Sequence, residues 1–222
     1  MHLLRIERTI NYHDVSTETL FPSFIWSCSI DIDPNKIKQE VYKIKKNHLS
    51  VVASNSSAHE NIKGGYHSPY FSPNPQYEIN YPCIFDMIKT SEKFTNKLLN
   101  DHIKVDREVD KISFWALINK PYDYNMIHVH PHTDLIGVYY ASLPKKSGNM
   151  VVIREDSFSL TNLGVEFSRE IFAEQGKLYV LPANLLHFVQ PNLSEDERIS
   201  IALNITVKNS KNAKTRPVFK VD

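Results

Sequence analysis

The second half of this chain is a series of short β-rich segments joined by turns, and this feature most limits the fold. From residue 109 onward the segments are KISFWALINKP, LIGVYYASL, NMVVIRE, KLYVLPANLLHFVQP and RISIALNITVK, with no helix-forming stretch between them. Parallel strands need a long crossover connection, usually a helix, whereas strands joined by turns pair in the antiparallel sense. The pattern therefore predicts an antiparallel sandwich or barrel.

The first half of the chain predicts a strand and two helices. An aromatic and β-branched stretch, LFPSFIWSCSIDID, is followed by DPNKIKQEVYKIKKNHL, where Asp33 is placed as an N-cap and Pro34 as the first helical residue. Apolar residues spaced i, i+4 and i+7 form one stripe on this helix, namely Ile37, Val41 and Ile44. We expect helices that lean on a β-sandwich core.

A second helix is predicted over CIFDMIKTSEKFTNKLLNDHI, residues 83–103. Its expected buried face comprises Phe85, Ile88, Phe94, Leu98 and Leu99. Between the two helices, residues 54–82 are rich in Gly, Pro, Ser and Asn, so this segment is predicted to be a long irregular loop. We expect its GGYHSPYFSPNPQY part to shape the entry to a functional site.

Length and composition indicate one globular domain over residues 1–222, with an N-terminal region (1–108), a β core (109–210) and a tail (211–222). The net charge of +1 argues against a dedicated nucleic-acid-binding protein, which usually shows a basic excess. No signal peptide or bilayer-spanning apolar run is evident, so we expect no membrane partner and a cytoplasmic location. Two widely separated cysteines, Cys28 and Cys83, fit a reduced protein, although one disulfide stays open.

Four histidines form the strongest functional signal. His128, His130 and His132 alternate just ahead of the apolar segment LIGVYY, and His187 follows a later apolar strand. In an extended strand the side chains at i and i+2 share a face, so His128 and His130 can approach one ion. A third ligand from another strand would leave part of the coordination sphere open, as in non-haem Fe(II) oxygenases.

Arg198 adds a second element to this hypothesis. It starts the next strand, eleven residues after His187, and a hairpin on the turn PNLSEDE would bring it back toward the histidine. The planar guanidinium suits bidentate binding of a carboxylate. Ser200 lies two residues further along and shares its strand face, so it can donate another hydrogen bond.

Taken together, these residues resemble the 2-oxoglutarate and Fe(II)-dependent oxygenases, and most closely a branch of bacterial and phage proteins. The branch pattern H-x-H-P followed by S-G-V-Y-Y is similar to HVHPHTDLIGVYY, and its downstream motif is similar to LPANLLHFVQPNLSEDERISIALN. SNSSAHENIKGGYHS and FWALINK also resemble segments of this branch. The resemblance spans about residues 18 to 207. The sequence departs from the branch at Ile136, where a serine is usual.

The resemblance implies a double-stranded β-helix, or jelly-roll, with N-terminal helices packed on its outside. It implies Fe(II), 2-oxoglutarate as co-substrate and O2, with release of succinate and CO2 and hydroxylation of an unactivated C–H bond. The far carboxylate of 2-oxoglutarate would meet Arg198 and Ser200. Tyr140 shares strand parity with Val138 and would line the co-substrate pocket. Three asparagines are further candidates for the interior of the barrel: Asn119, Asn125 and Asn204.

Two ligand sets compete for the metal. The branch pattern places the ligands at His128, His130 and His187, and we favour this set because Pro131 ends the strand directly after it and leaves room for a loop. The wider superfamily uses two histidines and a carboxylate, which here would be His132, Asp134 and His187. A mixed set of His128 or His130 with Asp134 and His187 is also open.

Two other functional classes fit the same residues. A cupin-like metalloenzyme would use a three-histidine site without 2-oxoglutarate, and Arg198 would then be dispensable. A non-catalytic β-sandwich binding module would bind neither metal nor co-substrate. The sequence names neither the oxidised substrate, which could be a small molecule or a side chain, nor the oligomeric state.

Overall fold

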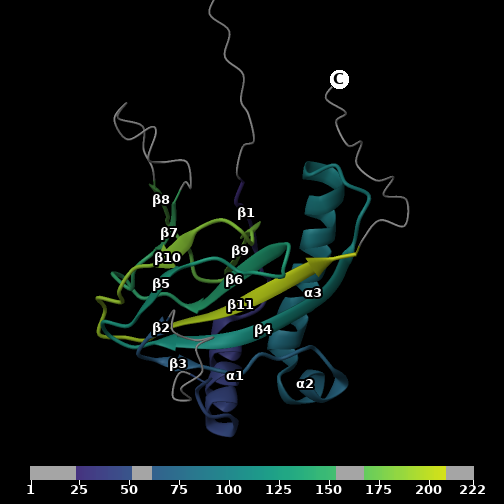
Figure 1. Cartoon of the computed structure of the whole chain (residues 1–222). Helices are drawn as coiled ribbons and strands as arrows, with labels where there is room; N and C mark the ends of the chain where they lie inside the picture. The colour runs from purple at the N-terminus through teal and green to yellow at the C-terminus, as the bar shows by residue number, and fades with distance from the viewer. Residues whose placement is uncertain (1–23, 52–61, 154–167, 209–222) are drawn as a thin grey trace, which may run out of the picture.

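Two antiparallel sheets form the body of the protein (Figure 1). The computed structural model describes residues 24–51, 62–153 and 168–208. One sheet has the strand order β1-β9-β6-β11-β4-β3 and the other β2-β5-β10-β7-β8. The bounds are β1 Trp26–Ser29, β2 Ile62–Lys63, β3 Tyr66–His67, β4 Val109–Asn119, β5 Tyr124–His128, β6 Leu135–Ser142, β7 Met150–Ile153, β8 Ser168–Ile171, β9 Lys177–Pro182, β10 His187–Val189 and β11 Arg198–Val207. The predicted antiparallel jelly-roll is confirmed.

The helices lie against the six-stranded sheet, as Figure 1 shows. Helix α1 (Pro34–Asn47) contacts β6 and β4, and α3 (Pro82–Lys97) contacts β4. The N-cap of α1 is as predicted, because the Asn35 N–H donates to Asp33 Oδ1 at 2.9 Å. The predicted apolar stripe of α1 has no exposed surface and so anchors the helix in the core: Ile37, Val41 and Ile44.

The second predicted helix is only partly correct. It divides into α3 and a π-helical turn, Leu98–His102. The predicted core residues Ile88, Leu98 and Leu99 are buried, but Phe85 and Phe94 are only half-buried. The stripe that packs inward also contains Ile84, Met87, Ser91 and Thr95. Apolar periodicity did not reveal this stripe because two of its members, Ser91 and Thr95, are polar. The buried Ser91 hydroxyl donates to the Met87 carbonyl oxygen at 2.8 Å.

The predicted irregular loop over residues 54–82 is also corrected. Residues 54–61 lie outside the described part of the chain, but the remainder contains β2, β3 and a short helix, α2 (Pro75–Asn80). Asn74 caps α2 by accepting the backbone N–H groups of Gln76 and Tyr77. An asparagine N-cap followed by proline is an ordinary signal for the start of a helix. The prediction of a loop rested on composition and did not use this signal.

The predicted hairpin between His187 and Arg198 is wrong. Strand β10 pairs with β5 and β7 in the five-stranded sheet, whereas β11 pairs with β4 and β6 in the six-stranded sheet. The connection therefore crosses from one sheet to the other. Buried Asn192 holds this crossing, because its Nδ2 donates to the carbonyl oxygens of Asn119 at 3.0 Å and Asp196 at 2.8 Å.

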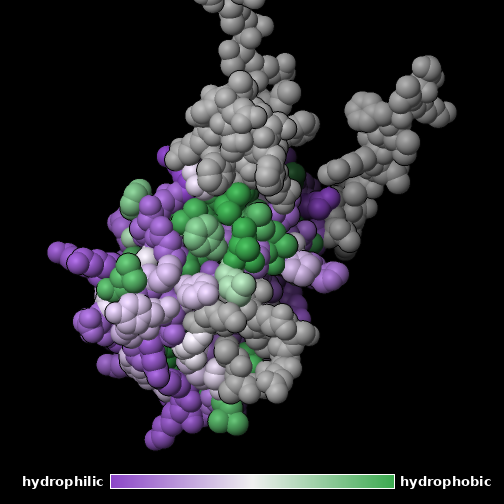
Figure 2. Space-filling view, turned by 60° about the vertical axis from the view of Figure 1, so that its left-hand side comes forward, coloured by the Kyte–Doolittle hydropathy of each residue, from purple (hydrophilic) through white to green (hydrophobic). Residues whose placement is uncertain are grey.

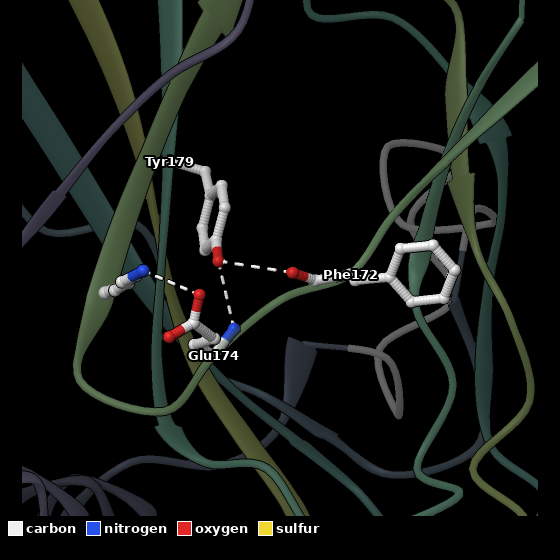
Figure 3. Close-up of polar contacts among 4 residues, drawn as sticks. Phe172, Glu174 and Tyr179 are labelled. Carbon is white, nitrogen blue, oxygen red and sulfur yellow. Dashed lines mark hydrogen bonds and ion pairs between the residues drawn. The ribbon is translucent and has the colours of Figure 1, made fainter.

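A tyrosine shapes the connection between β8 and β9 (Figure 3). The Tyr179 hydroxyl accepts the Glu174 N–H at 3.0 Å and donates to the Phe172 carbonyl oxygen at 3.5 Å. Lys177 forms an ion pair with Glu174 at 2.6 Å in the same turn. The Phe172 ring points away from these contacts and is 75% exposed, so the backbone and not the ring of Phe172 serves the turn.

The five-stranded sheet is the less covered of the two. Figure 2, in which the side carrying β5, β7 and β10 is turned forward, shows hydrophobic residues gathered within a largely hydrophilic surface. Met126, Ile127 and Val129 are each more than a third exposed.

Among the described residues, none of the helices combines the length and apolar character that a bilayer span requires. Cys28 and Cys83 are free thiols, so no disulfide joins them.

The segment 66–71, which we call the edge segment, runs along β4 as an additional backbone ladder. Tyr66 and His67 pair with Ile118 and Leu117, and Phe71 exchanges two backbone hydrogen bonds with Phe114. Two glycines in the left-handed region precede it, Gly64 with φ +76° and Gly65 with φ +73°. They bring the chain so close to β4 that a Cβ on Gly65 would lie 2.4 Å from the Ile118 carbonyl oxygen.

We predict that Gly65→Ala destabilises the protein much more than Gly176→Ala. Both positions have positive φ, but a Cβ on Gly176 (φ +82°) would lie 3.4 Å from Pro34 Cγ, which is an ordinary van der Waals contact. Alanine in this conformation costs about 1–2 kcal/mol at either site, and the backbone clash adds about 1–3 kcal/mol at residue 65 alone. Urea unfolding measures both; equal losses would contradict the close approach.

Candidate active site

Three imidazoles from two neighbouring strands meet in one place. His128 ends β5, His130 follows two residues later, and His187 begins β10 directly opposite His128. One ligand nitrogen from each ring lies within 4.8 Å of the other two. Within the described ranges, this is the only group of three or more histidine, cysteine or acidic side chains that converge in this way.

Hydrogen bonds set the same tautomer on all three rings. Nδ1 of His128 lies 2.6 Å from the Met126 carbonyl oxygen, and Nδ1 of His187 lies 2.7 Å from that of Leu185. His130 Nδ1 lies 2.9 Å from the side-chain oxygen of Asn204. These oxygens only accept, so each Nδ1 carries the proton and each Nε2 keeps a lone pair. Such partners orient the imidazoles of metal sites.

Burial keeps the three rings neutral. Burial, helped by the neighbouring His128, lowers the pKa of His187 to about 3. Burial, again helped by His128, lowers the pKa of His130 to about 4, and burial also lowers the pKa of His128 itself. Neutral imidazole is the form that binds transition metals, so the site is ready for a cation at neutral pH.

The alternative ligands lie elsewhere. The Asp134 carboxylate accepts the Val207 N–H at 2.8 Å, which ties it to the end of β11. His132 is exposed in the turn before it, with φ +62°. The structure therefore brings neither residue to His187, and a set or mixed set containing Asp134 would require this turn to rearrange.

Arg198 lies in the pocket that the histidines line. Its side chain is almost fully buried, at 1% exposure, and Nη1 donates to the backbone carbonyl oxygens of Ser147, Gly148 and Gln190. Nη2 has no partner among the described residues. A buried donor without a partner lowers the stability of the fold by about 1–3 kcal/mol, and a charged donor by more. Burial lowers the pKa of Arg198 from a very high starting value, so the group stays cationic and attracts an anion.

Two hydroxyls share the pocket with the guanidinium. Ser200 lies directly opposite Tyr140 across β11 and β6, and both line the pocket as their strand parity predicts. Burial raises the pKa of Tyr140 to about 12, so its hydroxyl remains a hydrogen-bond donor. Guanidinium and hydroxyls together form a donor group suited to a carboxylate.

The other sequence candidates also have clear positions. Asn119 lies opposite Arg198 in the β4–β11 ladder, lines the pocket and donates to Asn125 Oδ1 at 3.4 Å. Asn204 contacts His130 as described above. Ile136, where the resembling branch has serine, packs instead in an apolar cluster with Met150 and Leu181.

Sequence analysis expected the segment GGYHSPYFSPNPQY to shape the entry to a site, and two of its residues, His67 and Tyr70, line the pocket. It did not identify Trp115 beside them. Trp115 stacks between two histidines, with ring centroids 5.8 Å from His130 and 5.9 Å from His67. Tyr70 meets Trp115 edge-on at 4.8 Å. The sequence did contain a usable signal: Trp115, Leu117 and Asn119 are spaced two residues apart, so they share one face of β4, and all three line the pocket.

Comparison with known proteins places this site in context. Residues 113–204 match the family described as "Putative 2OG-Fe(II) oxygenase". The match runs from β4 into β11 and contains the three converging histidines and Arg198. No curated protein matches the chain significantly.

Solved structures show the same fold. A Pseudomonas putida prolyl-4-hydroxylase has a TM-score of 0.56 at 13% identity, covering 83% of this chain and 93% of its own. A Trichoplax adhaerens prolyl hydroxylase, solved with a hypoxia inducible factor peptide fragment, has 0.55 at 12%, covering 81% and 83%.

A viral collagen prolyl hydroxylase from Paramecium Bursaria Chlorella virus-1, in complex with 2OG, has a TM-score of 0.52 at 12% identity. It covers 83% of this chain and 96% of its own. At identities this low, the structural similarity shows the fold alone. Residues 113–204, somewhat less than half of the chain, are thus similar to the 2OG-Fe(II) oxygenase family, whose members are oxidoreductases that require Fe(II), 2-oxoglutarate and O2.

Proposed function

We propose that this protein is an Fe(II)- and 2-oxoglutarate-dependent dioxygenase that hydroxylates an unactivated C–H bond and releases succinate and CO2. One observation carries the proposal: three neutral imidazoles and a buried guanidinium with an unpaired donor line the same pocket. The first group suits a transition metal and the second a carboxylate. A single ligand that chelates the metal and ends in a carboxylate would satisfy both.

His128, His130 and His187 would hold the iron through Nε2. Three ligands from one side leave open positions for a chelating co-substrate and a gas. With its co-substrate and O2 bound, the iron supplies the oxidising chemistry, and the protein supplies placement and exclusion of water. Asn204, Met126 and Leu185 contribute by keeping the Nδ1 protons away from the metal side.

Arg198, Ser200 and Tyr140 would bind the far carboxylate of 2-oxoglutarate. Arg198 Nη2 provides a charged donor, and both hydroxyls lie on the same pocket face. Leu117, Val138 and Ala202 line the pocket beside them and keep its walls apolar. A charge-assisted hydrogen bond in such surroundings is stronger than one in water.

A cupin-like metalloenzyme is the second candidate, because a site of three histidines without a carboxylate is also suited to chemistry that needs no 2-oxoglutarate. The unpaired Arg198 donor favours the oxygenase, since the cupin-like enzyme gives it no role. A non-catalytic binding module would require the converging imidazoles to bind no metal.

We predict that His130→Ala weakens Mn(II) binding by more than about 100-fold, because a lost ligand costs more than a lost supporting partner. His132→Ala is the matched control, two residues away and exposed. Electron paramagnetic resonance of free Mn(II), without oxygen, measures both. Loss of binding in His132→Ala or Asp134→Asn, with His130→Ala unaffected, would favour the two-histidine, one-carboxylate set.

We predict that Arg198→Lys raises the KM for 2-oxoglutarate about 10- to 100-fold, because lysine keeps the charge but loses the planar fork. Succinate formed with Fe(II) under air is the measurement. Arg169→Lys, an exposed arginine on β8, should leave KM unchanged. Fe(II)-dependent activity that is the same in the Arg198→Lys variant and the unmodified protein would favour the cupin-like enzyme. Absence of any 2-oxoglutarate consumption would reject the oxygenase.

We predict that the metal-free protein loses stability between pH 7 and pH 5 partly through His187. The folded pKa of about 3 lies below the unfolded value of about 6.5, so the unfolded chain binds the proton first and stability falls as pH falls. At pH 5 this amounts to about 2 kcal/mol. Urea unfolding of His187→Gln should show a correspondingly weaker pH dependence; an unchanged dependence would mean that the imidazole is protonated in the fold.

A further inference from the structure

The connection between β10 and β11 contains a buried side chain to which the proposed function gives no part. Asn192 has no exposed surface and does not line the pocket. The two ends of this connection meet at the guanidinium, because Arg198 begins β11 and its Nη1 donates to the carbonyl oxygen of Gln190, directly after β10, at 3.0 Å. Asn192 therefore lies inside a loop that the Arg198 side chain closes.

The side chain of Asn192 ties the end of β4 to the chain that leads into Arg198. Nδ2 donates to the Asn119 carbonyl oxygen at 3.0 Å, and Asn119 is the residue opposite Arg198 in the β4–β11 ladder. Nδ2 also donates to the Asp196 carbonyl oxygen at 2.8 Å, and Oδ1 accepts the Ser194 N–H at 3.0 Å. The start of β11 is thus fixed relative to the strand beside it.

The backbone of Asn192 is fixed as well, by the turn that joins β4 to β5. Its N–H donates to the Asp123 carbonyl oxygen at 3.0 Å, and its carbonyl oxygen accepts the Tyr122 N–H at 2.6 Å. Both donors of the amide, its oxygen and both backbone groups therefore have partners. A side chain with every polar group paired and no exposed surface has one position available to it.

The same connection packs against the turn that supplies the other acceptors of the guanidinium. The carbonyl oxygens of Ser147 and Gly148 both accept from Nη1. Leu193, the residue after the asparagine, donates its N–H to the Lys146 carbonyl oxygen at 2.9 Å. Gly148 lies so close to the connection that a Cβ there would be 2.5 Å from the Gln190 carbonyl oxygen. A shift of the connection would therefore displace all the acceptors of Nη1.

We propose that Asn192 is the positioning residue of the Arg198 guanidinium. It fixes the connection, the connection fixes the acceptors of Nη1, and the planar guanidinium then fixes where Nη2 can meet an anion in the pocket. Asn192 itself touches neither metal nor anion. The inference rests on the proposed function for the identity of that anion, 2-oxoglutarate, and not for the position of the guanidinium.

Nitrogen NMR of the arginine side chains, without metal or co-substrate, tests this position. A guanidinium held by several acceptors rotates slowly about its Cζ–Nη bonds, so its two Nη nitrogens give separate signals, whereas a released one gives a single averaged signal. Arg198→Lys assigns the signals. We expect separate Arg198 signals in the unmodified protein and averaged ones in Asn192→Ala. Asn192→Ser, a milder change that keeps a hydroxyl, should show the same direction if the alanine variant does not fold.

Asn96→Ala is the matched control. Asn96 is a half-buried asparagine on α3 that accepts the Val109 N–H at 2.8 Å and does not line the pocket. Its loss removes a structural hydrogen bond far along β4 from Arg198, so the Arg198 signals should stay separate. Averaged signals in Asn96→Ala would mean that general loosening of the fold, and not the asparagine of the connection, releases the guanidinium, and would overturn the proposal.

Binding of labelled 2-oxoglutarate to the Mn(II)-loaded protein, without oxygen, measures the consequence. Asn192→Ala should weaken it about tenfold and leave Mn(II) affinity unchanged, because a displaced donor lowers affinity at its own site. Under turnover with Fe(II), the KM for 2-oxoglutarate should rise about tenfold with kcat within about twofold. In an Arg198→Lys background the further loss should be about threefold or less, since both changes act through one group. A full tenfold further loss would overturn the proposal.

The two measurements separate this inference from the proposed function. Averaged Arg198 signals in Asn192→Ala, in a protein that binds no 2-oxoglutarate even when unmodified, would reject the oxygenase and leave the positioning role supported. Separate signals in both Asn192 variants, or an affinity for 2-oxoglutarate equal to that of the unmodified protein, would overturn the positioning role and leave the oxygenase supported.

Discussion

The pairing of β5 with β10 is the constraint on which the site depends. His187 lies opposite His128, and Val189 lies opposite Asn125, so β5 has one residue more than β10 between the two pairs. This bulge matters because side chains alternate along a strand, and residues 125 and 128 would otherwise face opposite sides of the sheet. With it, both line the pocket. A different register would separate the imidazoles.

Several polar groups of the site are buried without a full set of hydrogen-bond partners, and a bound ligand would supply the missing partners. Three imidazoles held neutral by burial, with their Nε2 lone pairs directed to a common space, gain little from one another. The Arg198 guanidinium keeps one donor unpaired in a buried position. The core around them supplies the stability that permits this, since Ile199, Ile201 and Leu203 alternate with the pocket residues on β11 and are fully buried. Preorganisation for a metal and an anion thus reduces the stability of the empty protein.

Strand parity made much of the site predictable. It placed His128 with His130, Arg198 with Ser200, and Tyr140 with Val138, because a period of two needs no knowledge of tertiary structure. The same reasoning could not identify which sheet each strand joins, so the crossing after β10 was mistaken for a hairpin. The contacts of His67 and Tyr70 with Trp115 could not be predicted in the same way. They require the pairing of residues 66–71 with β4, which depends on the close backbone approach at Gly65, and composition describes this segment only as a loop.

Arg198 also connects the two sheets mechanically. It begins β11 in the six-stranded sheet, yet Nη1 donates to the carbonyl oxygen of Gln190, directly after β10 in the five-stranded sheet, and to that of Ser147, shortly before β7. Nη1 of the guanidinium thus joins the sheets, while Nη2 keeps no partner among the described residues. Because His128 and His187 lie on the five-stranded sheet and Ser200 on β11, the distance between the histidines and the hydroxyl donors depends on how the sheets are joined. An anion on Nη2 would hold the guanidinium in place and so stabilise the arrangement of the two sheets on which the proposed metal and carboxylate sites depend.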